Sequence, residues 1–122
     1  MRKARILIVD DEPGLVRVMT LMLTNLQRYE VHSVTDATLA LEAAVKFKPH
    51  LIILDWIMPK MHGGDVAQQF RADSRIRGTP IVILSAIMMD GSGEMAGFPA
   101  IAKPVGMHEL VEAIEQQLGE AA

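Results

Sequence analysis

The 122-residue chain contains no cysteine, which excludes disulfide bonds, thiolate metal sites and thiol catalysis. It also lacks an excess of basic residues, because 12 Lys and Arg stand against 15 Asp and Glu, for a formal net charge of -3. The sequence has no basic run of useful length. General attraction to nucleic acid or to anionic lipid is therefore not expected.

Long apolar segments are missing as well. The N-terminus places basic residues before the apolar stretch 6–9, but the acidic run Asp10-Asp11-Glu12 ends that stretch well short of a signal peptide or a membrane span. We therefore expect a cytoplasmic protein that does not associate with membranes.

What the chain does contain is the composition of a globular domain, since 50% of its residues are hydrophobic and 22% are charged. A chain of this length is the usual size of one domain and is long enough to bury one core. We expect residues 1–122 to form a single domain.

Short apolar runs alternate with segments of helical periodicity. Runs typical of buried strands occur at 6–9, 31–34, 51–54, 81–84 and 100–102. Helical spacing occurs at Leu15, Val18, Met19, Met22, Leu23 and Leu26, at Leu39, Ala40, Ala43, Ala44 and Phe47, at Val66, Ala67 and Phe70, and at Met107, Leu110, Val111, Ile114 and Leu118. The alternation predicts a parallel α/β sheet with helices on both faces, because each crossover must be right-handed and cover the sheet.

Segment 88–97 departs from this alternation. It holds Gly91, Gly93 and Gly97, and each glycine costs a helix about 1 kcal/mol relative to alanine. We therefore expect a short helical turn or a mobile loop between the fourth and fifth strands, in place of a full fourth helix.

Polar side chains stand at the ends of four predicted strands: Asp10 and Asp11, Asp55, Ser85 and Lys103. The carboxyl ends of parallel strands open on one edge, so these groups should converge there. Three crowded carboxylates would repel one another unless a cation joined them. Mg²⁺, which prefers oxygen ligands, fits such a site together with a phosphoryl oxygen.

This set of groups suits phosphoryl transfer. With the metal and the Lys103 ammonium screening its charge, Asp55 can attack the phosphorus of an activated donor and become an acyl phosphate. The Ser85 hydroxyl can donate a hydrogen bond to the new phosphoryl group. We do not expect Ser85 to be a nucleophile, because no histidine stands near it in sequence to act as a base.

The chain resembles the response-regulator receiver domains of two-component signalling, of the single-domain chemotaxis type. The resemblance covers nearly the whole chain and rests on motifs that follow four strands in order: Val9-Asp10-Asp11, Leu54-Asp55 with Met58-Pro59 and Gly63, Ser85-Ala86, and Lys103-Pro104. It implies a flavodoxin-like, doubly wound, five-stranded parallel sheet of order 2-1-3-4-5, here with a shortened or irregular fourth helix.

The resemblance also implies roles for individual residues. Asp55 would be the phosphoacceptor, while Asp10, Asp11, Asp55 and the backbone carbonyl of Ile57 would hold Mg²⁺. Ser85 and Lys103 would contact the phosphoryl group, and the Lys103-Pro104 peptide bond would be cis.

The implied function is that of a signalling switch, and the chain would not be an enzyme in the ordinary sense. A sensor histidine kinase or a histidine phosphotransfer protein would donate the phosphoryl group, and the receiver would assist its own phosphorylation and dephosphorylation. Its output would be contact with an unidentified protein, since these residues hold no effector domain. It would act as a monomer or as a dimer linked to phosphorylation.

Three positions depart from the family pattern. Ala100 stands where receivers commonly carry an aromatic ring that couples phosphorylation to output. Ile57 and Ile87 stand two residues after the phosphoacceptor and two after the serine, where side chains tune hydrolysis of the acyl phosphate. We hypothesise that these two apolar side chains hinder a hydrolytic water and prolong the life of the phosphoryl group.

Other functions are compatible with parts of the pattern. A dehalogenase-like phosphohydrolase also forms an aspartyl phosphate, but it needs a second Asp where this chain has Ile57. A flavodoxin shares the fold, but Asp10-Asp11-Glu12 would repel a cofactor phosphate after the first strand. The serious alternative is a receiver-like binding or scaffold module that signals without phosphorylation.

Overall fold

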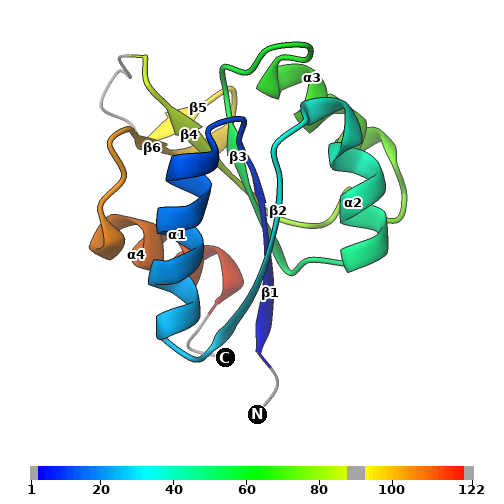
Figure 1. Ribbon diagram of the computed structural model, residues 1–122. Coiled ribbons are helices and arrows are strands. Elements are labelled where there is room, and N and C mark those ends of the chain that lie inside the picture. The colour runs from blue at the N-terminus through cyan, green and yellow to red at the C-terminus, as the bar shows by residue number, and fades with distance from the viewer. Residues whose placement is uncertain (1–2, 88–92, 120–122) are drawn as a thin grey trace.

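Four α-helices, one 3-10 turn and six strands make up the described part of the chain, residues 3–87 and 93–119 of a computed structural model (Figure 1). The strands are β1 (Ala4–Val9), β2 (Tyr29–Val34), β3 (Leu51–Asp55), β4 (Ile81–Ser85), β5 (Glu94–Met95) and β6 (Phe98–Ala102). The helices are α1 (Pro13–Asn25), the 3-10 turn η1 (Ala37–Leu39), α2 (Ala40–Phe47), α3 (Gly63–Ala72) and α4 (Met107–Leu118).

The strands form one sheet in the order β2-β1-β3-β4-β6-β5. The first five in this order are parallel, and they reproduce the predicted order 2-1-3-4-5, with β6 as the predicted fifth strand. The flavodoxin-like doubly wound architecture is therefore confirmed. The sixth strand, β5, was not predicted; it pairs antiparallel with β6 at the edge of the sheet.

The segment before β6 forms a hairpin. Within the described residues 93–97 there is a short strand and a turn in place of the expected short helical turn or mobile loop. The turn is made by Ala96 and Gly97, which both have positive φ, at 54° and 85°. This pair of left-handed residues is typical of tight hairpin turns. The rest of the glycine-rich segment, residues 88–92, lies outside the described residues.

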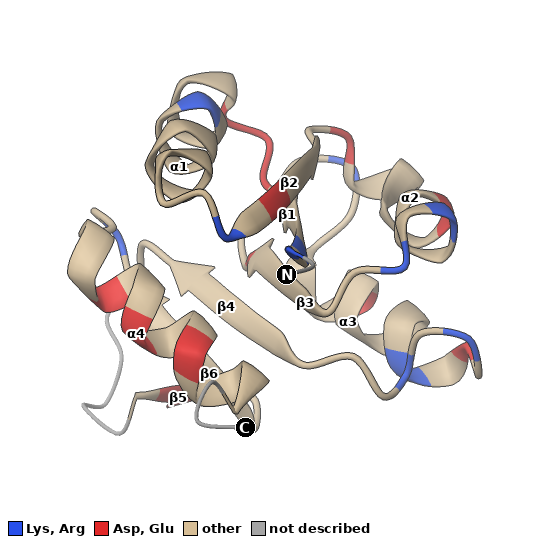
Figure 2. Cartoon of the chain, turned by 90° about the horizontal axis from the view of Figure 1, so that it is seen from below, with Lys and Arg blue, Asp and Glu red and all other residues tan. Residues whose placement is uncertain are grey.

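Helices cover both faces of the sheet, with α1 and α4 on one side and α2 and α3 on the other (Figure 2). Successive residues of each strand point to opposite faces, so the central strands carry apolar residues on both faces. Thus Ile6 and Ile8 of β1 pack with Met19 of α1, whereas Leu7 and Val9 pack on the side of Phe70 of α3. All of these side chains are fully buried.

The predicted core stripes are correct for α3 and need correction elsewhere. Val66, Ala67 and Phe70 of α3 are buried as predicted. In α1 the structure buries Val16 and leaves Val18 51% exposed, and Leu39 and Met107 are also exposed. Apolar residues at three- and four-residue spacing are compatible with neighbouring helix phases, so the pattern alone did not decide between Val16 and Val18.

No helix in the described ranges 3–87 and 93–119 has the length and apolar character that crossing a membrane requires.

Candidate functional site

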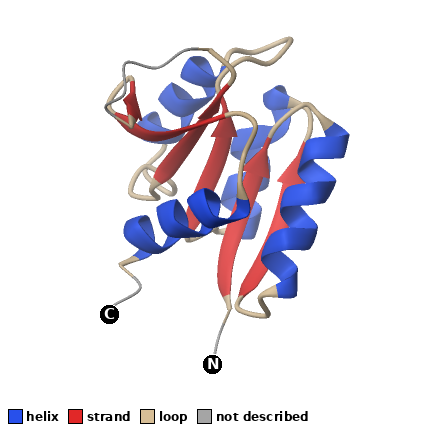
Figure 3. Ribbon diagram, turned by 90° about the vertical axis from the view of Figure 1, so that its left-hand side faces the viewer, coloured by secondary structure: helices blue, strands red, loops and turns tan. Residues whose placement is uncertain are grey.

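The carboxyl ends of the parallel strands lie on one edge of the sheet (Figure 3). Asp10 follows β1, while Asp55 and Ser85 are the last residues of β3 and β4. These three are the buried polar or charged residues in the described part of the chain, at 0%, 2% and 0% exposure. Within the described residues, burial of polar groups is confined to this edge, which marks it as the functional site.

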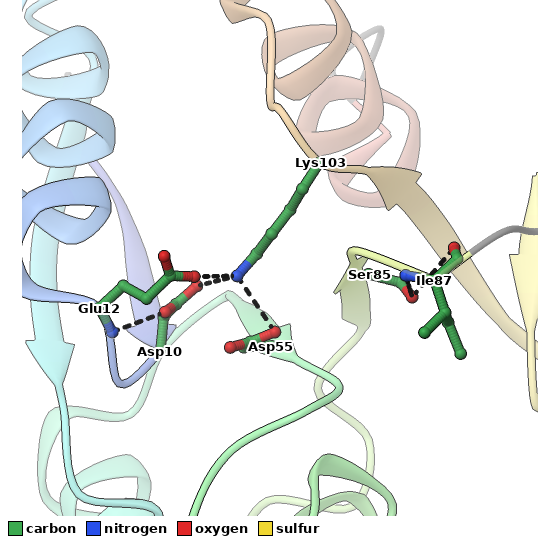
Figure 4. A network of polar contacts seen from close by, with 6 residues as sticks. All are labelled: Asp10, Glu12, Asp55, Ser85, Ile87 and Lys103. Atoms are coloured by element: carbon green, nitrogen blue, oxygen red, sulfur yellow. Dashed lines mark hydrogen bonds and ion pairs between the residues drawn. The ribbon is translucent and has the colours of Figure 1, made fainter.

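Lys103, which follows β6, reaches across this edge to the predicted carboxylates (Figure 4). Its Nζ lies 3.3 Å from Asp10 Oδ2 and 3.3 Å from Asp55 Oδ1. A closer partner was not predicted: Glu12 Oε1 accepts a hydrogen bond from Lys103 Nζ at 2.5 Å. In the sequence Glu12 directly precedes Pro13 at the start of a predicted helix, and nothing in that pattern pointed to Lys103.

The three carboxylates among the predicted metal ligands form a compact cluster. Asp10, Asp11 and Asp55 each offer a carboxylate oxygen, and these oxygens lie within 4.8 Å of one another. Asp10 Oδ1 accepts a hydrogen bond from the Glu12 N–H at 2.9 Å. Asp10 Oδ2 is buried and has no hydrogen-bond partner among the described residues, and only the ion pair with Lys103 lies close to it.

An unsatisfied buried carboxylate oxygen is rare in proteins, because it costs the full desolvation of the group. A hard divalent cation would satisfy it and would neutralise the neighbouring carboxylates. The donor set of oxygens from Asp10, Asp11 and Asp55 therefore fits Mg²⁺.

The electrostatics of the site are those of crowded, buried carboxylates. Burial, reinforced by the negative charge of Asp10, raises the pKa of Asp55 to about 7, although Lys103 acts in the opposite direction. Burial also raises the pKa of Asp10, opposed by the hydrogen bond from Glu12 and by Lys103. Burial lowers the pKa of Lys103, but its contacts with Glu12, Asp10 and Asp55 outweigh this effect and leave its pKa above the ordinary value.

Ser85 lies beside this cluster without joining it (Figure 4). Its Oγ accepts a hydrogen bond from the Ile87 N–H at 3.2 Å and lies 3.5 Å from the Ile87 carbonyl oxygen. The backbone carbonyl of Ser85 accepts a hydrogen bond from the Lys103 N–H at 2.8 Å, which fixes the ends of β4 and β6 side by side. The predicted residue is thus at the site, with its hydroxyl directed to the backbone of its own loop.

Ile57 lies in the loop between β3 and α3. The loop is closed by a hydrogen bond from the Gly63 N–H to the Trp56 carbonyl at 2.9 Å. Lys60, with φ of 70°, anchors the loop through an ion pair to Asp36 at 3.0 Å. Ile57 itself is 50% exposed.

Two further features of the site are now clear. The Lys103-Pro104 peptide bond is cis, as the resemblance implies. His62, for which the sequence suggested no role, caps α3: its Nδ1 accepts a hydrogen bond from the Gly64 N–H at 2.9 Å.

A carboxylate held beside an ammonium and a cation-binding cluster can attack an electrophilic phosphorus, because this reaction needs mainly positioning and charge neutralisation. The structure brings together Asp10, Asp11, Asp55 and Lys103, and it adds Glu12.

Comparison with known proteins identifies relatives with this architecture. The family model described as "Response regulator receiver domain" matches residues 6–115. The DNA-binding response regulator MtrA of Mycolicibacterium smegmatis is 34% identical over 121 residues, which cover 95% of this chain and 51% of MtrA. The chain spans about half the length of the curated relatives it matches.

Solved structures agree with this match. The receiver domain of sensor histidine kinase PA1611 from Pseudomonas aeruginosa, solved with magnesium coordinated in its active site cleft, is similar with a TM-score of 0.84 and 30% identity, covering 96% of this chain and 98% of that one. The chemotaxis protein CheY4 of Vibrio cholerae is similar with a TM-score of 0.84 and 28% identity, covering 95% and 99%.

The family match begins within β1 and ends within α4, and it includes every polar residue of the site. Fold, strand order and sequence agree on one conclusion: this chain belongs to the family of response regulator receiver domains.

Proposed function

We propose that the chain is a phosphorylation-dependent switch of a two-component system, in which Asp55 accepts a phosphoryl group from a phosphohistidine donor. One observation carries the proposal: the buried Asp55 carboxylate lies 3.3 Å from the Lys103 ammonium and shares a cluster of oxygens, all within 4.8 Å, with Asp10 and Asp11. This is the arrangement that an in-line attack on phosphorus requires.

The residues that would hold Mg²⁺ are Asp10, Asp11 and Asp55, together with the backbone carbonyl of Ile57. Support comes from the unsatisfied Asp10 Oδ2 and from the pKa of Asp55, which burial and then the negative charge of Asp10 raise. Bound Mg²⁺ would neutralise the oxygens of the phosphoryl group and of the carboxylates.

In the reaction, an Asp55 carboxylate oxygen attacks the phosphorus of the donor. A P–O bond forms and the P–N bond to the donor imidazole breaks, with its electron pair leaving on the imidazole nitrogen. Lys103 balances the charge of the transferred group. The Ser85 hydroxyl turns from the Ile87 backbone to donate a hydrogen bond to a phosphoryl oxygen, and it does so without an aromatic partner because position 100 is alanine.

The chain acts as a stoichiometric phosphoacceptor that assists its own phosphorylation and dephosphorylation, and so it is not a conventional enzyme. Its donor is a sensor histidine kinase or a histidine phosphotransfer protein, and its target is a protein. It works as a monomer or as a phosphorylation-linked dimer, in the cytoplasm, and residues 1–122 act as one receiver domain.

Direct contact with nucleic acid by these residues is not part of the proposal. The matched relative MtrA is named as DNA-binding, but this chain covers only about half of it. The charged residues of α4 are acidic, at Glu109, Glu112 and Glu115 (Figure 2), and would repel DNA phosphates.

The proposal is tested by incubating the protein with a small acyl phosphate or phosphoramidate and Mg²⁺, and then measuring its intact mass. We expect one phosphoryl adduct that requires Mg²⁺ and is lost in Asp55→Asn. Asp65→Asn, which makes the same chemical change at an exposed position of α3, should retain the adduct. The absence of an adduct under forcing conditions would instead support a scaffold that works without phosphorylation.

A further inference from the structure

The partner closest to Lys103 is a residue outside the predicted site. Glu12 Oε1 lies 2.5 Å from Lys103 Nζ, against 3.3 Å for the carboxylates of both Asp10 and Asp55. The Lys103 side chain is 13% exposed and that of Glu12 is 57% exposed. Glu12 therefore holds the ammonium from the solvent side of the site.

Glu12 occupies the N-cap position of α1 but does not use its side chain as a cap. Its backbone is extended there, with φ of -97° and ψ of 100°, and its side chain makes no capping hydrogen bond. Glutamate is not among the residues that favour this capping position. Its carboxylate is directed to Lys103 instead.

Two hydrogen bonds fix the backbone of Glu12. Its N–H donates a hydrogen bond to Asp10 Oδ1 at 2.9 Å, and its carbonyl accepts one from the Val16 N–H at 3.0 Å. The residue is thus anchored on both sides, and only its side chain is free to exchange Lys103 for water. Glu12 is not part of the cluster formed by Asp10, Asp11 and Asp55.

A lysine ammonium has three N–H donors, and three carboxylates already surround Lys103. A phosphoryl group on Asp55 would bring a further acceptor, so one carboxylate must give way. Water can replace Lys103 at the exposed Glu12 more readily than at the buried Asp10 or Asp55.

We propose that Glu12 is a positioning residue that holds Lys103 at the mouth of the site and competes with the phosphoryl group for its ammonium. This inference rests on the proposed function. Exposed ion pairs contribute up to about 1 kcal/mol, and removing a competitor worth about 0.5 to 1 kcal/mol should tighten the binding of a phosphoryl mimic about two- to fivefold.

The test compares Glu12→Gln, Glu12→Asp and the wild type in beryllium fluoride titrations at saturating Mg²⁺, followed by the fluorescence of Trp56. The control is Glu30→Gln, which removes the same charge from the amino end of β2, where Glu30 is paired in register with Arg5. We expect Glu12→Gln to bind the mimic two- to fivefold more tightly and Glu30→Gln to match the wild type. Glu12→Asp, whose shorter side chain withdraws from Lys103, should follow Glu12→Gln.

A second measurement reports on the contact itself. The ¹⁵N and ¹H signals of the Lys103 ammonium should shift in Glu12→Gln without the mimic, and remain unchanged in Glu30→Gln. A purely structural role of Glu12 would change the free energy of unfolding and leave the affinity for the mimic unchanged.

Several results would overturn the inference. One is that Glu12→Gln binds the mimic no more tightly than the wild type does. Another is that Glu12→Asp binds it with wild-type affinity, which would mean that the charge at position 12 acts without the contact to Lys103. If the wild type forms no Mg²⁺-dependent adduct and binds no beryllium fluoride, the proposed function fails and this inference fails with it. If the wild type binds beryllium fluoride and Glu12→Gln binds it equally well, only the proposed role of Glu12 fails.

Discussion

The backbone of Gly63 lies directly against the carbonyl group of Asp55. A β-carbon at position 63 would overlap the Asp55 carbonyl oxygen and the Cα atom of Trp56. Both obstacles are backbone atoms, so no side-chain rotation can relieve them. This close approach lets α3 begin immediately beside the end of β3 and keeps the intervening loop tight.

Gly63→Ala should therefore be destabilising. Overpacking of this kind lowers the free energy of unfolding by about 1 to 3 kcal/mol, which denaturant unfolding followed by circular dichroism would measure. Gly14→Ala is the control, because a β-carbon there would have no neighbour within 4 Å and Gly14 lies in the first turn of α1. It should be neutral or stabilising by up to about 1 kcal/mol. Equal stability of the two variants would contradict this reading of Gly63.

Removing the Asp55 charge should stabilise the metal-free protein in a pH-dependent way. The pKa of Asp55 is raised from 3.8 to about 7 in the folded protein. Between these values the folded state keeps a proton that the unfolded chain releases, so the free energy of unfolding falls as the pH rises from about 4 to 7. Asp55→Asn should raise the free energy of unfolding at pH 8 by on the order of 1 to 3 kcal/mol, and by less at pH 5.

The measurement is denaturant unfolding of both proteins in a chelator at the two pH values, followed by circular dichroism. Adding Mg²⁺ at pH 8 should narrow the difference in the free energy of unfolding between the two proteins, because the cation stabilises the wild type more than Asp55→Asn. A difference between the proteins that does not change with pH would rule out a strongly raised pKa at Asp55.

The fluorescence of Trp56 should report metal binding at the neighbouring Asp55. Trp56 is the only tryptophan, and its ring contacts that of His62 edge to face at 5.0 Å between centroids. A titration with Mg²⁺ at a fixed pH of 8 should give a saturable change. Asp11→Asn should weaken the affinity about tenfold or more, since it would remove one of the carboxylates proposed to bind the cation. Glu30→Gln, with the same loss of charge, should bind as the wild type does.

Arg71 connects three segments beside the hairpin. Its Nη1 donates hydrogen bonds to the carbonyl groups of Arg77 and Thr79, both at 2.9 Å, and its guanidinium lies 5.3 Å from the centroid of Phe98. Arg71→Lys should lower the free energy of unfolding by about 1 to 2 kcal/mol, because an ammonium cannot make both hydrogen bonds and also stack on the ring. Arg17→Lys on the exposed side of α1 should have no effect. Equal effects of the two substitutions would refute the role of Arg71.

The phosphoryl group on Asp55 should be long-lived, because Ile57 and Ile87 place apolar side chains where family members tune hydrolysis. Both side chains are about half exposed, at 50% and 48%. Ile87→Glu would offer a carboxylate to orient a water and should speed the loss of the adduct roughly tenfold or more, as measured by intact mass after removal of the donor. Val18→Glu, at a residue of α1 with similar exposure, is the control. The hypothesis would be disproved if the wild type lost the phosphoryl adduct rapidly and Ile87→Glu lost it at the same rate.

The main features of the fold could be predicted because apolar runs and polar strand ends coincide in this chain. The buried run 51–54 ends at Asp55, and Lys103 follows the last strand, so a parallel sheet necessarily brings them to one edge. The edge hairpin could not be predicted in the same way. Glycines at 93 and 97 disfavour a helix, but they do not indicate whether the chain forms a loop or pairs with the next strand.

The partners of side chains were the least predictable part of the site. Strand order places Asp10 and Asp55 close to Lys103, but the contact with Glu12 depends on the rotamer of a long side chain at a helix start. Likewise, sequence chemistry assigned the Ser85 hydroxyl to a phosphoryl group, whereas without one it bonds to the Ile87 backbone. The fold places several acceptors within reach of each donor, and the sequence does not show which acceptor the donor will bond to.

The two-residue strand β5 also affects how this protein behaves at high concentration. Without it, the five-residue β6 would be the last strand of the sheet and would present its backbone N–H and carbonyl groups as a template for another chain. The hairpin covers the first two of these residues, Phe98 and Pro99, and Glu94 adds a charge to the new edge. The antiparallel pairing thus acts as a barrier to edge-to-edge aggregation along the first part of β6.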